Sequence, residues 1–107
     1  MDATKRERIE AAGFRVGTVS EFLELTPEER ELVELRLALS TALKGHRLKE
    51  RLSQERLARR LNSSQSRVAK MEAGDSSVSI DLLIRALLAA GATRKELAHV
   101  IADGAGE

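Results

Sequence analysis

The sequence contains no cysteine, tryptophan or tyrosine, and it has one proline. Without cysteine the chain can form no disulfide, and it offers no thiolate for a metal site or for nucleophilic catalysis. No run approaches the roughly 18 apolar residues of a membrane span, and the opening segment MDATKRERIEAAG lacks the apolar stretch of a signal peptide. These absences predict a soluble, cytoplasmic protein that has no membrane partner.

The chain is 107 residues long, which is the length of a single domain. Hydrophobic residues make up 42% and charged residues 33%, so enough apolar surface is present to offset the entropy lost on folding. Sixteen leucines and fifteen alanines stand against two phenylalanines, a composition that favours helices over sheets. We therefore predict an all-α fold.

The formal net charge of +1 hides an uneven distribution of charge along the chain. Between Lys44 and Lys70 there are nine bases and two acids, whereas acids outnumber bases in the segments on either side. A basic block can mark a surface that binds nucleic acid, because each base that neutralises a phosphate releases a condensed counterion. The alternative is an ordinary solvated helix face.

Start and stop signals divide the chain into five predicted helices. Two begin at T-x-x-E patterns, at Thr26 and Thr93, and Pro27 strengthens the first of these. The other three follow serines that can cap them, at Ser53, Ser64 and Ser79. The predicted helices cover residues 27–50, 54–61, 65–73, 80–90 and 94–102. The predicted domains are an N-terminal extension over residues 1–26, a helical domain over 27–102 and a flexible tail over 103–107.

The first predicted helix carries an apolar stripe with the 3.6-residue period of an amphipathic helix. Its members are Leu32, Leu35, Leu39 and Leu43.

The segment from Leu52 to Gly74, LSQERLARRLNSSQSRVAKMEAG, contains two short capped helices separated by three residues. This spacing is typical of a helix-turn-helix. We expect apolar residues of the two helices to face each other, namely Leu57, Ala58 and Leu61 against Val68 and Met71.

The outward face of the second short helix is small and polar. A helical wheel places Ser66, Ala69 and Lys70 on this face, and Gln65 lies in the first turn. Such a face fits the DNA major groove, where glutamine can pair with adenine and alanine can contact a thymine methyl group. An ordinary solvated surface is the alternative.

Residues 52–74 resemble the Xre, or Cro/C1-type, helix-turn-helix family of phage repressors. The pattern L-x-Q-x-x-L-A begins at Leu52, S-x-S begins at Ser64 and M-E-x-G begins at Met71. The sequence departs from the family at Asn62, where glycine is usual, and at His46, where the residue is often apolar. The resemblance implies that Gln54 binds a phosphate, that Gln65 and Ser66 read base edges with Lys70 extending the readout, and that Arg47 and Glu72 form a structural ion pair.

The segment GFRVGTVSEFLELTPEE, which precedes this motif, is similar to the HigA-like branch of the family, the antitoxins of type II toxin-antitoxin modules. That similarity implies a homodimer that represses its own promoter and neutralises a RelE- or HigB-like toxin. The predicted toxin contacts are Phe14, Val16 and Phe22, and the predicted dimer contacts are Leu97, Val100 and Ile101. Packing of either set on the protein's own core is the alternative.

These observations predict a sequence-specific repressor that binds double-stranded DNA. The side chains predicted to contact phosphates are Gln54, Ser64, Arg56, Arg60 and Arg67, and those predicted to read bases are Gln65, Ser66, Ala69 and Lys70. A two-fold dimer would bind an inverted repeat whose half-sites lie one turn, about 34 Å, apart.

A catalytic function is not predicted. His46 and His99 fall in different helices without metal-ligand spacing, and no glycine-rich phosphate loop is present. We therefore expect no catalytic residue, metal or cofactor. Two alternatives stay open, a protein-interaction adaptor and a stand-alone phage-type repressor without a toxin, and salt-dependent binding separates DNA recognition from apolar docking.

Overall fold

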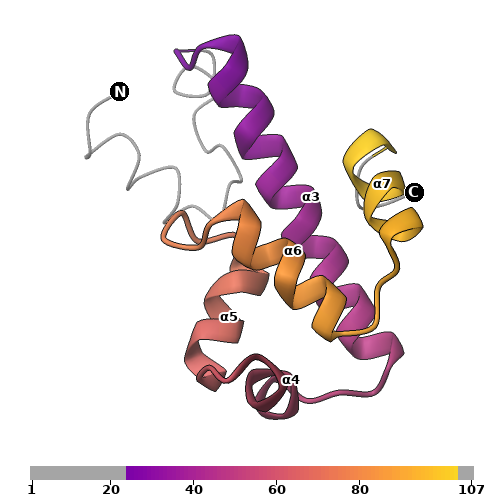
Figure 1. The fold of residues 1–107 in the computed structure, drawn as a ribbon. Coiled ribbons are helices and arrows are strands. Elements are labelled where there is room, and N and C mark those ends of the chain that lie inside the picture. The colour runs from indigo at the N-terminus through magenta and orange to yellow at the C-terminus, as the bar shows by residue number, and fades with distance from the viewer. Residues whose placement is uncertain (1–23, 104–107) are drawn as a thin grey trace.

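The computed structural model describes residues 24–103, and these residues form five helices without any strand (Figure 1). The helices are α3 (Pro27–Lys49), α4 (Gln54–Leu61), α5 (Gln65–Ala73), α6 (Ile80–Ala89) and α7 (Arg94–Asp103). The all-α prediction is confirmed, and each predicted helix over this range is present. None of the described helices is both long and apolar enough to cross a membrane.

Side chains cap the helix starts in the manner that the sequence indicates. At α3 the Thr26 hydroxyl accepts a hydrogen bond from the Glu29 amide at 3.1 Å, and the Thr26 amide donates to the Glu29 carboxylate at 2.8 Å. The same reciprocal box opens α7. Ser53, Ser64 and Ser79 each accept from the backbone N–H three residues ahead. Local chemistry therefore sets where all five helices begin.

Left-handed residues end the helices around the motif. Asn62 follows α4 with φ 54°, and Gly74 follows α5 with φ 73°. Arg51 also has a positive φ, of 58°, just after α3. Asn62 and Gly74 are residue types that tolerate this conformation. Arginine does not readily adopt this conformation, so the turn after α3 carries backbone strain. No residue in the local sequence predicts this strain.

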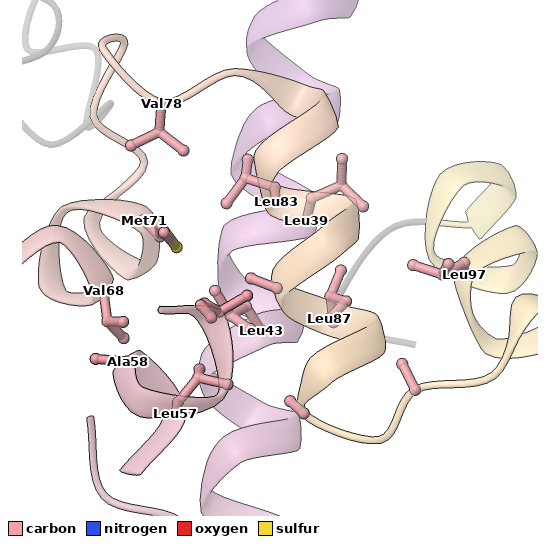
Figure 2. Packing of buried hydrophobic residues seen from close by; sticks show 14 residues of the cluster. Leu39, Leu43, Leu57, Ala58, Val68, Met71, Val78, Leu83, Leu87 and Leu97 are labelled. Atoms are coloured by element: carbon pink, nitrogen blue, oxygen red, sulfur yellow. The ribbon is translucent and has the colours of Figure 1, made fainter. Parts of the chain in front are cut away.

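The core lies where α3, the longest helix, runs behind α6 and packs against α5, while α4 packs against α5 and α6 (Figures 1 and 2). α7 packs against α3 on the other side of α6 (Figure 1). The large side chains that are fully buried come from four helices and one loop, and they are Leu39, Leu43, Leu57, Val68, Met71, Val78, Leu83 and Leu87. One continuous core therefore holds α4 and α5 in place.

The apolar stripe predicted along α3 is buried over its second half only. Leu39 and Leu43 are buried, but Leu32 is 50% exposed. The first turns of α3 extend past the ends of α5 and α6 (Figure 1), so Leu32 follows the predicted period but lies outside the core.

Replacement of Leu43 by alanine should lower the free energy of unfolding by about 2–5 kcal/mol, because it opens a cavity in the closed core. Leu48→Ala on the same helix is the matched control. Leu48 is 57% exposed, so its loss should change stability by no more than about 0.5 kcal/mol. Urea unfolding followed by circular dichroism measures both, and equal effects at the two positions would contradict this core.

Candidate nucleic-acid interface

Helices α4 and α5 form a compact pair joined by a tight turn. The turn is closed by the Ser63 amide, which donates to the Ala58 carbonyl at 2.8 Å. Ala58 is 3% exposed, and its small side chain allows close approach of the two helices. Leu57 and Leu61 join Val68 and Met71 in the buried cluster, as the sequence predicts (Figure 2).

The outward face of α5 consists of residues that the sequence singles out. Val68 and Met71 point toward the core (Figure 2). Gln65, Ser66 and Lys70 are exposed and Ala69 is half-buried. The structure therefore brings the four predicted base-reading residues to the solvent side of one short helix.

A buried ion pair attaches α5 to α3. Arg47 of α3 is 8% exposed, and its guanidinium donates to both carboxylate oxygens of Glu72, with an Nη2 to Oε1 distance of 3.1 Å. Nη1 donates to the Leu52 carbonyl at 2.8 Å. The hydrogen bond to Glu72 raises the pKa of Arg47 above its ordinary value. One permanently charged side chain thus connects α3, the segment between α3 and α4, and α5.

The ion pair continues as a chain of hydrogen bonds to the surface of α5. Gln54 of α4 donates from Nε2 to Oε1 of Glu72 at 3.1 Å, and Gln65 donates from Nε2 to Oε1 of Gln54 at 2.6 Å. A carboxylate only accepts, so Gln54 must turn its NH₂ group to Glu72 and its oxygen to Gln65. The amide orientation of Gln65 is fixed in the same way. Its carbonyl oxygen and one N–H have no part in this chain.

Helical spacing could not reveal this connection, because Gln54 and Gln65 lie on different helices. Sequence reasoning assigned them separate contacts, one with phosphate and one with a base. The structure brings the two amides together and leaves Gln54 a second N–H for another acceptor.

The predicted phosphate-contacting arginines differ in their surroundings. Arg56 and Arg67 are exposed. Arg60 donates from Nη1 to the carbonyl of Ala89 at 3.0 Å, at the end of α6, so its guanidinium also ties α4 to α6. Arg59, which the sequence analysis did not select, is exposed on the same short helix.

A hollow of about 200 Å³ lies beside the start of α5. Ser64, Ser66, Arg67 and Lys70 line it, and Ser77 joins them from the loop between α5 and α6. Sequence reasoning missed Ser77, which lies outside the predicted motif. Hydroxyl groups beside two cationic side chains suit the binding of an anion.

The residues predicted to bind other proteins lie in two regions. Leu97 is 8% exposed and belongs to the core cluster, which is the alternative that the sequence left open for it. Val100 packs partly against that cluster, whereas Ile101 is 48% exposed. Phe14, Val16 and Phe22 lie outside the described residues.

A family model described as a helix-turn-helix domain matches residues 38–100. The chain belongs to the helix-turn-helix domain family. The match begins inside α3 and ends inside α7, so it includes the whole α4–α5 pair. Searches of curated proteins and of solved structures gave no match. The domain indicates a DNA-binding regulator, and the match agrees with the Xre resemblance at that level.

The stability of the helix-turn-helix domain should fall far more when one partner of the ion pair is removed than when both are removed. Arg47→Met leaves the buried Glu72 carboxylate without its positively charged partner, so stability should fall by about 3–5 kcal/mol. The double variant Arg47→Met/Glu72→Met should recover more than half of that loss. Arg85→Met, at an exposed position on α6, is the control. Urea unfolding of all four proteins tests the pair, and a double variant as unstable as Arg47→Met would contradict it.

Acid should destabilise the loop between α5 and α6, which contributes Ser77 to the hollow. Hydrogen bonds from the hydroxyl and the backbone N–H of Ser77 lower the pKa of Asp75. A carboxyl group with a depressed folded-state pKa stabilises the protein above its unfolded pKa of about 3.9, and that stability is lost as the pH falls through the folded value. Unfolding measured from pH 7 to pH 2 should therefore be less pH-dependent in Asp75→Asn than in the original protein. An unchanged acid dependence would contradict this role of Asp75.

Proposed function

We propose that this helix-turn-helix protein is a sequence-specific transcriptional repressor that places α5 in the major groove of double-stranded DNA. One observation carries the proposal. The hydrogen bond from Gln65 Nε2 to Gln54 Oε1 orients the Gln65 amide. It leaves the Gln65 carbonyl oxygen as an acceptor and one N–H as a donor for a base. This pair of groups is what an adenine edge requires, since N6 donates and N7 accepts.

The neighbouring residues support this arrangement. Ser66, Ala69 and Lys70 share the outward face of α5 with Gln65, and we assign base contacts to all four. We assign phosphate contacts to Gln54, Ser64, Arg56 and Arg67, and to Arg60 in addition to its bond with Ala89. Ser64, Arg67 and Ser77 of the hollow would bind one of the phosphates. In this proposal the protein binds DNA and catalyses no reaction.

We also propose that the protein acts as a homodimer on an inverted repeat. Exposed Ile101 and half-buried Val100 support a contact through α7. An Xre-type antitoxin that neutralises a RelE- or HigB-like toxin remains a narrower prediction, and it rests on the resemblance of the segment around Phe14 and Phe22. The alternatives are a stand-alone repressor and an adaptor module. DNA binding and its salt dependence would separate the adaptor from a repressor of either kind.

Gln65→Ala should reduce affinity for the preferred DNA site by about 1–3 kcal/mol and relax the preference at one base position. The measurement is an anisotropy titration on the DNA upstream of the coding region, with an unrelated duplex as competitor, at two salt concentrations. Lys70→Ala should also weaken binding, whereas Lys95→Ala, an exposed lysine on α7, is the matched control.

Specific, salt-sensitive binding that Gln65→Ala weakens supports the repressor. The same loss on every duplex would place Gln65 on the backbone instead of a base. Equal affinity for both duplexes at either salt concentration would overturn the proposal and favour the adaptor.

A further inference from the structure

A groove of about 560 Å³ lies between α3 and α7, and all of its lining residues belong to these two helices. Its volume lies in the range of pockets that bind small organic molecules. Ala42 and Gly45 of α3 and Val100 of α7 contribute its apolar part. The groove is therefore separate from the α4–α5 surface assigned to DNA.

Gly45 of α3 lines the groove. This glycine is internal to α3, where alanine would favour the helix more than glycine does. Its backbone is not in the left-handed region, and a Cβ atom built on it meets nothing within 4 Å. Neither backbone conformation nor close packing accounts for glycine here, and its effect is to leave space above α3.

Two lysines line the groove, Lys49 of α3 and Lys95 of α7. His46 and His99 also line it, and each lies against a carboxylate, Glu96 and Asp103 respectively. Glu96 is the one carboxylate in the lining, and it is already engaged. Its Oε1 accepts from the Thr93 amide at 2.8 Å, and its Oε2 lies 3.4 Å from Nε2 of His46. The ammonium groups of Lys49 and Lys95 would attract an anion to the groove.

We propose that this groove binds a small organic anion with an apolar body, such as an aromatic carboxylate. The apolar body lies over Gly45, Ala42 and Val100, and the carboxylate lies toward Lys49 and Lys95. The site requires no DNA contact, so its test is independent of the test of DNA binding, although it shares Val100 with the proposed dimer contact.

The probe is 2-naphthoate, with neutral 2-naphthamide as its matched control. Each is titrated into ¹⁵N-labelled full-length protein, and amide resonances are followed by NMR. Naphthoate should shift the resonances of Gly45, Ala42 and Val100 and should bind at least about tenfold more tightly than naphthamide, through the charge-assisted contacts that only the carboxylate makes. Equal affinity for the two compounds, or shifts elsewhere without shifts at Gly45, overturns the proposal.

Gly45→Leu fills the groove from its floor and should abolish naphthoate binding. The variant is expected to fold, because leucine favours helices and its Cβ has free space. The double variant Lys49→Gln/Lys95→Gln should weaken binding about tenfold, while Lys44→Gln, an exposed lysine of α3 outside the lining, should leave it unchanged. If Gly45→Leu fails to fold, the lysine variants decide the result.

A second copy of the chain is the competing occupant. Sedimentation velocity of Gly45→Leu separates it from the small anion. Loss of a dimer in this variant, with naphthoate binding retained, would show that another protomer occupies the groove and would overturn the proposal.

Discussion

The pairing of Arg47 with Glu72 is the interaction on which the arrangement of the motif depends. A charged guanidinium inside a small helical domain needs partners for its donors, and it finds them on α5 and at Leu52. Taking these charges out of water offsets much of their attraction, so such a pair contributes more to geometry than to net stability. Its effect here is to fix the distance between α3, which organises the core, and α5, which is exposed.

The same carboxylate connects the interior to the surface. Because Glu72 can only accept hydrogen bonds, it determines how the Gln54 amide is turned, and Gln54 determines how Gln65 is turned. A flexible glutamine on the surface of α5 is thereby ordered before any ligand arrives. Pre-ordering of this kind reduces the entropy lost on binding. The basic side chains around it carry no such restraint except Arg60, which is bonded to the end of α6.

The sequence predicts the parts of this structure that depend on neighbouring residues. Helix starts follow from threonine, serine and glutamate at fixed short spacings, and Asn62 and Gly74 mark the ends of the two motif helices. Features that depend on distant segments are not predictable in this way. The exposure of Leu32 depends on how far α3 extends past its neighbours, and the bond from Arg60 depends on where α6 ends. The left-handed backbone at Arg51 has no local signal, and Ser77 approaches α5 only because the following loop turns back.

The four outward residues of α5 differ in how well the fold would tolerate their substitution. Gln65 belongs to a hydrogen-bonded chain that ends in the buried ion pair, so a new side chain at this position would disturb groups that the fold uses. Ser66 and Lys70 project from a helix whose packing is supplied by Val68 and Met71, and Ala69 is half-buried between them. Substitution at positions 66 and 70 therefore changes the surface without changing the scaffold. In the proposed repressor, divergence of DNA-target preference among descendants of this protein would be easiest at those two positions, with position 65 as the fixed reference point.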